Sequence, residues 1–384
     1  MKRIVILGGG FGGLAAANEM EHLASSKKAE VTLIDSNARF SMGFAMQWAM
    51  IGRRGAGEGE RPYSGLKAKN VRFVNDEIIS ISLRKNKVLT KRHSIGYDYL
   101  IIALGAEPAP ETVPGLAEGS YNLCSMHSVM VMKSALESIS KGTVAIMVSS
   151  VPFKCPPAPY EYALLIDDML RKKKVRDMVK IVVTTPEPQP MPVAGKAVGE
   201  QVKAMLAQRG IEFFPEHRPR EVDQAKKEVE YDNGEKIKYD ILGAMAPHRA
   251  PKVVREAGLT DNSGFVPVEL GTFKTAVENV YAVGDVASIK LPNGKPHPKA
   301  GVFAEAQAVV AAGNIMAGIE GKEPPLYEGK GACYIDIGME TAIPADVYLL
   351  TPEGPKVFLG QPSKEGVEQK LKFERERLKK WFGK

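Results

Sequence analysis

The stretch that decides the fold is RIVILGGGFGG, residues 3–13. Residues 3–7 predict a buried strand of the parallel type, and a glycine run follows it at once. The run contains GxGxxG, in which Gly8 allows a tight turn, Gly10 lets the backbone approach a pyrophosphate, and Gly13 lets a helix pack closely on the strand. The next ten residues predict that helix, whose first amides would face the phosphates. The stretch therefore predicts the first turn of a dinucleotide-binding Rossmann domain.

An acid at the end of the next predicted strand supports this interpretation. Residues 30–35, EVTLID, end in Asp35, 22 residues after Gly13. An acid in that position accepts hydrogen bonds from an adenosine ribose. A glycine-rich turn alone is common, but a strand, GxGxxG, a helix and a terminal acid in this order are specific. The predicted dinucleotide contacts are Gly8, Gly10, Phe11, Gly12, Gly13 and Asp35.

Size and composition narrow the class of protein. The 384 residues are too many for one ordinary core, so we expect two or three domains. The net charge of +7 allows an anionic membrane, an anionic substrate or nucleic acid as partner, but the sequence contains no nucleic-acid-binding motif. No apolar run reaches the roughly 18–20 residues of a transmembrane helix, and the apolar start before Gly8 is too short for a signal peptide. We therefore predict a cytoplasmic protein that does not bind nucleic acid.

Two distant segments distinguish a flavin site from a nicotinamide site. Residues 97–106, YDYLIIALGA, predict a strand that ends in a turn of small residues, and residues 279–287, NVYAVGDVA, predict a strand that ends in Gly-Asp. Both segments resemble motifs of flavin disulfide-reductase-like enzymes, although Leu104 stands where a threonine is common. The resemblance implies FAD as the cofactor and implies that the Asp285 carboxylate holds its ribityl chain. The additional contacts predicted here are Gly105, Gly284 and Asp285.

The second domain is predicted to have the same plan without a nucleotide loop. Residues 143–149 predict its first strand, a helix begins near Tyr160, and residues 179–185 predict the next strand. The loop before the helix, residues 150–159 (SVPFKCPPAP), contains no glycine and four prolines. Prolines remove backbone N–H donors and stiffen a turn, so this loop cannot cradle a pyrophosphate. We therefore expect a Rossmann-like scaffold that does not bind NADH.

The same loop delivers a cysteine toward the predicted flavin. Ligands of α/β sheets bind at the carboxyl ends of the strands, so this loop should point at the cofactor. Cys155 stands just before a helix N-terminus, a position that lowers the pKa of a thiol and favours the thiolate. The other cysteines are Cys124 and Cys333, and no CxxC pair is present, which excludes a four-thiolate zinc site. A small buried thiol without chemistry is the alternative for each cysteine.

Around Cys155 the chain resembles the sulfide:quinone oxidoreductase and flavocytochrome c sulfide dehydrogenase families. The resemblance covers nearly the whole chain and is carried by the FAD motifs, by FKCPPAPYE at residues 153–161 and by KGACY at residues 330–334. It implies that Cys155 and Cys333 form a redox-active pair beside the flavin and that Cys124 is the third cysteine of the quinone reductases. The flavocytochrome subunits typically lack this third cysteine and carry export signals, and both differences favour the quinone reductase.

The resemblance also implies the chemistry. Hydrosulfide attacks a disulfide or sulfur-bridged form of Cys155 and Cys333, and electrons pass to FAD and on to a quinone. Lys299 matches a family lysine that would stabilise the reduced flavin, with an ordinary surface lysine as the alternative. Glu161 matches a family acid that could move a proton, or it is simply an acid in the first turn of a helix. His127 lies about one residue from the family's spacing, so its role stays open.

The C-terminal region is predicted to form a basic amphipathic helix from about Ser363 to Lys384. Residues 364–384 contain eight Lys or Arg and four Asp or Glu, a net charge of +4. The apolar face is formed by Val367, Leu371, Leu378, Trp381 and Phe382. Such a helix favours an anionic membrane surface, the place where apolar quinones are found, and the alternatives are packing on the protein itself or pairing in a homo-oligomer. The Met-rich residues 40–48 could line a quinone path or belong to the core.

We therefore predict an α/β protein with two Rossmann-like dinucleotide-binding domains, as in glutathione-reductase-like flavoproteins, and a short C-terminal segment. Residues 1–114 and 265–325 form the FAD-binding domain, residues 115–264 the second domain, and residues 326–384 the C-terminal segment. The predicted activity is sulfide oxidation with a membrane quinone as acceptor, by a protein held peripherally at the cell membrane. The competing interpretations are a sulfide dehydrogenase with a cytochrome acceptor, an NADH:quinone-type reductase, and a non-catalytic flavoprotein that senses redox state.

Overall fold

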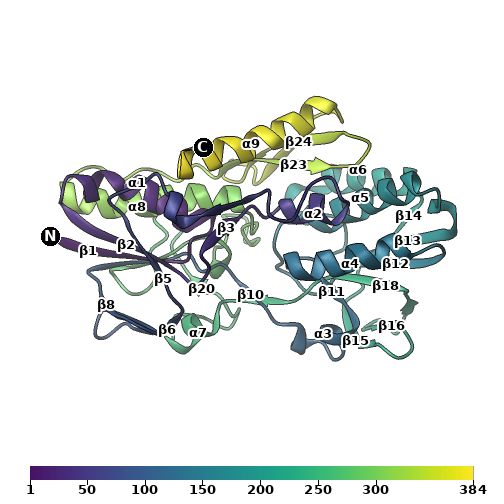
Figure 1. Cartoon of the computed structure of the whole chain (residues 1–384), viewed down its shortest axis with the longest axis horizontal. Coiled ribbons are helices and arrows are strands. Elements are labelled where there is room, and N and C mark those ends of the chain that lie inside the picture. The colour runs from purple at the N-terminus through teal and green to yellow at the C-terminus, as the bar shows by residue number, and fades with distance from the viewer. Residues whose placement is uncertain (384) are drawn as a thin grey trace.

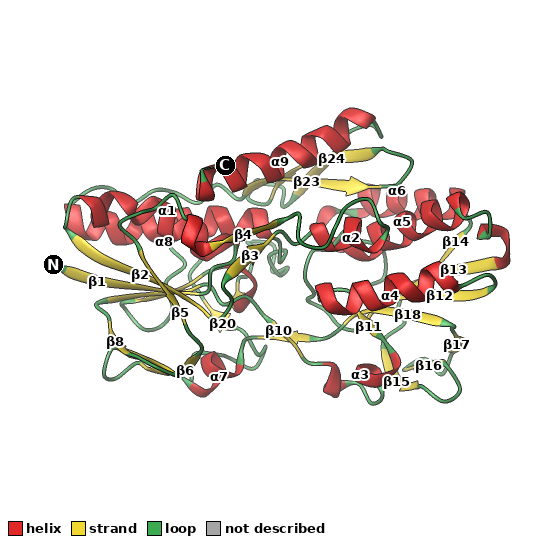
Figure 2. Ribbon diagram, in the orientation of Figure 1, coloured by secondary structure: helices red, strands yellow, loops and turns green. Residues whose placement is uncertain are grey.

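The first domain is built on a parallel five-stranded sheet (Figures 1 and 2). The computed structural model describes residues 1–383. In spatial order the strands are β21 (Val280–Ala282), β9 (Tyr99–Ile102), β1 (Lys2–Leu7), β2 (Ala29–Asp35) and β5 (Arg72–Asn75). β1 pairs with both β2 and β9, so the strand before the glycine run lies at the centre of the sheet.

The two faces of this sheet are covered in different ways. Helices α1 (Phe11–Ser25) and α8 (Gly301–Glu320) pack together on one face, as Figure 1 shows. The other face is covered by an antiparallel sheet and by the short helix α7 (Lys252–Glu256). That sheet consists of β6 (Ile78–Ser82), β7 (Lys87–Thr90) and β8 (Ser94–Gly96).

The second domain repeats this plan strand for strand. Its parallel sheet consists, in order, of β11 (Tyr121–Asn122), β18 (Ile241–Met245), β12 (Gly142–Val148), β13 (Val179–Thr184) and β14 (Ile211–Phe214). One face carries α4 (Met126–Ser138), α5 (Ala158–Lys172) and α6 (Lys196–Gln208). The other face carries α3 (Leu116–Gly119) with β15 (Pro219–Asp223), β16 (Glu228–Tyr231) and β17 (Lys236–Lys238). The predicted α/β fold with two Rossmann-like domains is confirmed.

Short elements join these parts. The antiparallel ribbon of β10 (Glu107–Pro108) and β19 (His248–Arg249) crosses between the domains. The remaining elements are β3 (Arg39–Ser41), β4 (Glu60–Pro62), α2 (Ala45–Met50), β20 (Val266–Pro267) and β22 (Ala287–Ser288). Ala250, Val254 and Leu259 pack in the core beneath the first sheet. We therefore propose that the domain junction lies at the β10–β19 ribbon, a little before the predicted boundary at residue 264.

The C-terminal segment lies across both domains (Figure 1). It is a sheet of β23 (Lys330–Asp336), β24 (Ala342–Tyr348) and β25 (Lys356–Leu359), followed by helix α9 (Lys364–Phe382). Ile335 and Ile343 enter the core of the second domain, whereas Trp381 and Phe382 enter the core of the first. The segment thus joins the two domains through their apolar interiors.

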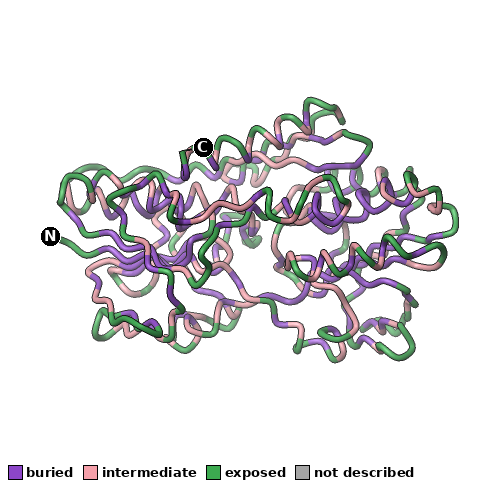
Figure 3. The backbone as a smooth tube through the Cα atoms, in the orientation of Figure 1, coloured by how far each residue is buried: buried purple, intermediate pink, exposed green. Residues whose placement is uncertain are grey.

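This packing corrects the predicted role of the apolar face of α9. Trp381 is 1% exposed, and Leu378 and Phe382 are also buried, so these side chains are not available to a membrane. The exposed residues of α9 from 364 to 382 are charged ones, and Figure 3 shows exposed positions along the outer side of this helix. The alternative interpretation, an amphipathic helix packed on its own protein, describes these residues.

One helix in the described part of the chain, α8, is long and apolar enough to cross a membrane by length and composition. Its contacts show a different use. Ala308, Ala312 and Ile315 are buried in the core of the first domain, and the helix packs along α1. α8 is therefore a core helix of the first domain.

Candidate active site

The glycine run between β1 and α1 forms an open cradle. Gly8 has φ +95°, and a Cβ there would lie 2.5 Å from a backbone carbonyl oxygen, so the turn requires glycine. A Cβ on Gly13 would lie 1.7 Å from the Gly8 carbonyl oxygen, which shows how closely helix and strand approach. A Cβ on Gly10 would meet nothing within 4 Å. Gly10 therefore faces open space at the start of α1, where a pyrophosphate needs room and backbone N–H donors.

The acid at the end of β2 lies beside this cradle. Asp35 Oδ2 accepts a hydrogen bond from the Gly9 backbone N–H at 2.6 Å, and its Oδ1 accepts one from Asn37 at 2.7 Å. The carboxylate is thereby held at the mouth of the glycine turn. The open cradle and the adjacent acid fit a dinucleotide that enters from this edge of the sheet.

A cavity of about 340 Å³ lies where the two domains and the C-terminal segment meet. Each of the three parts contributes side chains with chemistry to its wall. They are Asp285, Lys299, Cys124, Cys155, Glu161, Cys333 and Lys370, and Phe11 of the cradle also lines it. Asp285 is placed by the turn after β21, in which Gly284 has φ +75° and donates its N–H to Gln307 Oε1 at 2.8 Å. The cavity continues the cradle, as the ring end of a flavin dinucleotide requires.

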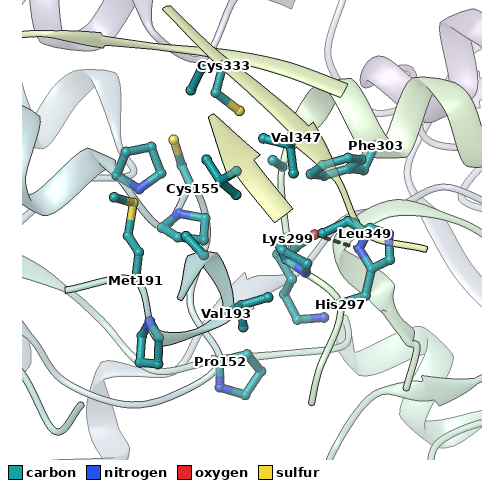
Figure 4. A pocket seen from close by; sticks show the side chains of 18 of the residues that line it. Pro152, Cys155, Met191, Val193, His297, Lys299, Phe303, Cys333, Val347 and Leu349 are labelled. Atoms are coloured by element: carbon teal, nitrogen blue, oxygen red, sulfur yellow. Dashed lines mark hydrogen bonds between the residues drawn. The ribbon is translucent and has the colours of Figure 1, made fainter. Parts of the chain in front are cut away.

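The two predicted redox cysteines lie together, between this cavity and a second one. Cys155 and Cys333 also line an apolar cavity of about 110 Å³. In Figure 4 their sulfur atoms point into the same space. Both are free thiols in the structure, one from the loop before α5 and the other from β23, 178 positions apart in the sequence. The fold therefore brings together the pair that the sequence predicted.

Comparisons with known proteins agree with this arrangement. The family described as pyridine nucleotide-disulphide oxidoreductase matches residues 2–148, and the family described as the central part of the flavoprotein chain of sulfide dehydrogenase [flavocytochrome c] matches residues 129–246. The X-ray structure of the sulfide:quinone oxidoreductase from the hyperthermophilic bacterium Aquifex aeolicus is similar with a TM-score of 0.86 and 26% identity, covering 98% of this chain and 90% of its own. The chain is similar to sulfide:quinone oxidoreductases over nearly its whole length.

Two curated relatives show the breadth of this likeness. A mitochondrial sulfide:quinone oxidoreductase from Dictyostelium discoideum is 29% identical over 331 residues, which are 82% of this chain and 70% of that protein. A type II NADH:quinone oxidoreductase from Staphylococcus aureus is 23% identical over 353 residues, 88% of this chain and 86% of that protein. The chain is a flavoprotein oxidoreductase, and the predicted cofactor FAD is confirmed. The cradle, Asp35 and Asp285 are the residues whose geometry fits it.

The loop that carries Cys155 is fixed against the first domain. The Cys155 backbone N–H donates to the Lys299 carbonyl oxygen at 2.7 Å, and Lys154 and Lys299 form a parallel bridge. Cys155 itself has φ +54°, a conformation that residues with a side chain rarely adopt. These contacts hold the thiol in place in the loop between β12 and α5, which corresponds to the glycine run of the first domain.

The expected lowering of the pKa of the Cys155 thiol is wrong. Solvent that enters the cavity reaches this residue, yet the apolar walls raise the pKa of the thiol above its usual value, and the carboxylate of Glu161 raises it further. Burial also raises the pKa of Cys333 to about 11. Glu161 stands in the first turn of α5. Its negative charge disfavours a thiolate and so opposes the effect of the helix N-terminus. The ammonium of Lys370 opposes the shift at both cysteines.

Lys299 is buried, at 7% exposure, so it is not the surface lysine of the alternative interpretation. Its ammonium donates to the backbone carbonyls of Asp285 at 2.7 Å and Ala287 at 3.0 Å, and lies 3.6 Å from the centroid of the Phe265 ring. Burial lowers its pKa to about 8. In Figure 4 the ammonium points away from the two cysteines. Lys299 thus fixes the turn that carries Asp285.

The prediction from sequence missed Lys370, the lysine whose charge acts on both cysteines. Its ammonium pairs with Glu161 Oε1, and both side chains are buried. Glu161 Oε1 also accepts the Asp336 N–H at 2.9 Å, and its Oε2 accepts from Gln47 at 2.9 Å. Burial raises the pKa of Glu161 and Lys370 opposes that shift. The signal was in the sequence, because Lys370 falls on the apolar face of α9, where a charge needs a partner.

An aromatic wall closes one side of the larger cavity. Phe373 lies 6.2 Å from Phe44 and 6.0 Å from Tyr334, measured between ring centroids, and all three line the cavity. The Met-rich residues 40–48 divide between the two predicted roles. Phe44, Met46 and Gln47 line the cavity, whereas Phe40, Met42 and Trp48 are buried in the core.

The third cysteine lines the larger cavity with the pair but does not line the apolar cavity. Cys124 lies in the turn before α4 and lines the larger cavity, where burial raises the pKa of its thiol to about 11. Its backbone N–H donates to Asn122 Oδ1 at 2.8 Å. His127 is exposed in the first turn of α4 and lines neither cavity. The structure therefore places Cys124 at the flavin cavity and His127 outside it.

Proposed function

We propose that this chain oxidises sulfide at Cys155 and Cys333 and delivers the electrons through FAD to a quinone. The observation that carries the proposal is that the two thiols stand between an apolar cavity and the cavity that continues the glycine cradle. A substrate in the first cavity can react with sulfur on one side of the pair while the flavin site lies on the other. The sulfide:quinone oxidoreductase from Aquifex aeolicus, with its similar fold, supports this assignment.

The sulfur step starts from the oxidised pair. Hydrosulfide attacks the disulfide, so that one S–S bond breaks, a new S–S bond forms to the incoming sulfur, and one cysteine leaves as a thiolate. The raised pKa values of the thiols oppose the formation of a thiolate. Lys370 counteracts this effect because its ammonium favours the charged form of both cysteines. When bound, FAD would accept two electrons and pass them on to an acceptor.

The acceptor side is proposed to lie against the aromatic wall. Phe44, Tyr334 and Phe373 offer flat apolar surfaces to a quinone ring, and Lys370 with Glu161 lies next to them in the same cavity. Reduction of a quinone consumes two protons. The buried Lys370–Glu161 pair is the candidate that supplies a proton at this wall.

We further propose that the protein works at the surface of a membrane. Quinones are apolar molecules of the bilayer, and a net charge of +7 attracts the protein to anionic lipid. The attraction is expected to be electrostatic, because the apolar face of α9 is buried. Sedimentation with anionic vesicles at low salt, and its loss with neutral vesicles or at high salt, is the expected result. A cytoplasmic location and a homo-oligomer remain predictions.

An anaerobic titration tests the function. The purified yellow protein is mixed with sulfide, which should bleach the flavin absorbance, and then with a soluble quinone, which should restore it. Restoration by a cytochrome but not by quinone would favour the sulfide dehydrogenase interpretation. No bleaching by sulfide would contradict the proposal and leave the non-catalytic redox sensor.

A further inference from the structure

A buried carboxyl group lines the apolar cavity and has no part in the chemistry above. Glu187 follows β13 in the loop at residues 186–190 and is 9% exposed. Its Oε2 atom has no hydrogen-bond partner in the described part of the chain. Among the described residues that line this cavity, Glu187 is the one carboxyl group. A buried polar atom without a partner is costly, so an occupant of the cavity that can donate to it is expected.

The other polar groups of the cavity are already engaged. His297 uses both ring nitrogens, at 2.9 Å from the Pro298 carbonyl oxygen and at 2.7 Å from the Tyr327 hydroxyl. The Lys299 ammonium is held by the carbonyls of Asp285 and Ala287. Apart from the two cysteines, Glu187 is therefore the lining group with an atom left to bind a small polar molecule.

We propose that Glu187 is the base that takes a proton from hydrogen sulfide as it enters the apolar cavity. The inference rests on the proposed function. An apolar cavity admits the neutral molecule more readily than the hydrosulfide anion, yet the anion is the nucleophile that attacks a disulfide. In the proposed step the S–H bond breaks, an O–H bond forms on Glu187, and hydrosulfide remains in the cavity. The negative charge moves from the carboxylate to sulfur, so no net charge is added to the cavity.

The surroundings of Glu187 suit a group that gains and loses a proton near neutral pH. Burial raises its pKa to about 7. The groups that face it are the hydroxyls of Tyr160 on α5 and Thr185 at the end of β13, which lower its pKa in part. The Tyr160 hydroxyl and Oε2 nevertheless remain outside hydrogen-bonding geometry.

Glu187 is separate from the acid that acts on the cysteines. The charges that act on Cys155 and Cys333 include those of Glu161 and Lys370 but not that of Glu187. Glu187 is therefore placed to act on the substrate before the sulfur step, while Glu161 and Lys370 act on the pair itself.

The test compares Glu187→Gln with wild type in stopped-flow reduction of the FAD holoenzyme by sulfide, between pH 6 and 9. At pH 7 we expect the variant to be slower by about 100-fold, the lower end of the range for loss of a positioned base. At pH 9, where sulfide is already ionised in solution, we expect the difference to shrink to less than about threefold. The matched control is Glu216→Gln, because Glu216 is exposed although its backbone N–H donates to the Glu187 carbonyl oxygen.

The outcomes separate the inference from the function on which it rests. If wild type is not reduced by sulfide at any pH, the proposed function fails. If wild type is reduced and Glu187→Gln follows it at every pH, the assignment of Glu187 is wrong. Reoxidation by quinone serves as an internal readout and should be equal in both proteins. If Glu187→Gln retains no FAD, Glu187→Asp replaces it: the shortened carboxylate should give an intermediate rate at pH 7, and a wild-type rate would contradict the proposal.

Discussion

The two domains carry different loops on the same sheet. β1 and β12 both lie at the centre of five parallel strands with matching order, and each is followed by a turn into a helix. After β1 the turn offers backbone N–H groups and open space at Gly10. After β12 it offers a side chain, Cys155, in a loop of prolines fixed to the first domain. The same position can hold a phosphate or a reactive sulfur, depending on whether its residues are small or rigid.

The helices that follow these loops also differ, in the negative charge placed at their N-termini. The N-terminus of a helix favours a negative charge. At α1 the open cradle leaves that charge to a dinucleotide phosphate. At α5 it is supplied from within, by Glu161 in the first turn, and Lys370 of the C-terminal segment balances it. In the second domain the Glu161–Lys370 ion pair thus stands where the first domain would bind a dinucleotide phosphate.

The largest expected effect comes from replacing Cys155, in the loop after β12, or its partner Cys333. Cys155→Ser and Cys333→Ser should each slow reduction of the flavin by sulfide by ~1000-fold or more, because neither serine can form the S–S bond. Stopped-flow absorbance measures the rate. Cys124→Ser is the control and should lose less, since Cys124 does not line the apolar cavity that is proposed to admit the substrate. A single variant of the pair that reacts at the wild-type rate would end the paired-cysteine mechanism.

Breaking the internal ion pair is expected to be the next largest effect. Lys370→Met leaves the buried Glu161 without its partner, a change that typically costs about 3–5 kcal/mol of stability. Thermal unfolding measures this, and quinone reoxidation should slow by about tenfold or more if the pair supplies a proton. Lys372→Met, at an exposed position of the same helix, should change neither. Equal stability of both variants would show that the Lys370–Glu161 pair is not coupled to the fold.

The first loop can be altered at two glycines with opposite consequences. Gly10→Ala should fold normally, because its Cβ meets nothing, but should weaken FAD binding by about 10–100-fold as the methyl group takes space near the pyrophosphate. Gly13→Ala should destabilise the protein itself, since its Cβ would lie 1.7 Å from a carbonyl oxygen. Flavin content and the unfolding midpoint, measured together, separate the two effects. Full flavin retention by Gly10→Ala would mean that the phosphate lies elsewhere.

The acids that follow equivalent strands lie in different surroundings. Asp35 ends β2 beside the glycine turn, whereas Glu187 follows β13 in an apolar wall. Burial raises the pKa of Glu187 from 4.5 to about 7, so the folded state holds a proton that the unfolded state has lost. Its contribution to stability is present at low pH and should fall by about 1.4 kcal/mol between pH 6 and pH 8. Denaturant unfolding should show this decline in wild type relative to Glu187→Gln, and parallel curves would contradict it.

The smallest expected effect is that of NADH. The loop at residues 150–157 has no glycine, so micromolar NADH should not bleach the flavin measurably. The likeness to a type II NADH:quinone oxidoreductase makes this a sharp comparison. Rapid bleaching would show that the second domain still binds a nucleotide and would revive the NADH:quinone reductase interpretation. Dithionite is the positive control for a flavin that can be reduced.

What could be predicted from sequence depended on whether a residue acts alone or through a distant contact. Gly8, Gly13 and Asp35 act within one local motif, and their placement agrees with the sequence prediction. The position of Cys155 followed from knowing where the strands end, whereas its pairing with Cys333 was implied only by the family resemblance. Local reasoning failed for the pKa of Cys155, because the apolar walls and Glu161 outweigh the helix terminus.

The residues that were missed depend on packing between segments. From the sequence, Lys370 is predicted to be one more cation of a basic tail. In the structure, α9 buries it against Glu161. From the sequence, Trp381 and Leu378 fit a membrane-binding face and a protein core equally well, because an amphipathic pattern does not show what covers the apolar face. In the structure both side chains are buried in the protein. Glu187 lies in a loop rich in prolines, and only the cavity gives it a chemical context.

The C-terminal segment has a consequence for the order of folding. The cradle, the second sheet and Cys155 are all encoded before residue 246, but Ile343 and Trp381, which enter one core each, are synthesised among the last residues. During synthesis, therefore, Cys155 is an unpaired thiol and the cores of both domains are still incomplete. Arrival of β23 and α9 closes both interiors and supplies Cys333 in one event. Cys155 can therefore meet Cys333 only after the C-terminal segment has been made and has joined the two domains.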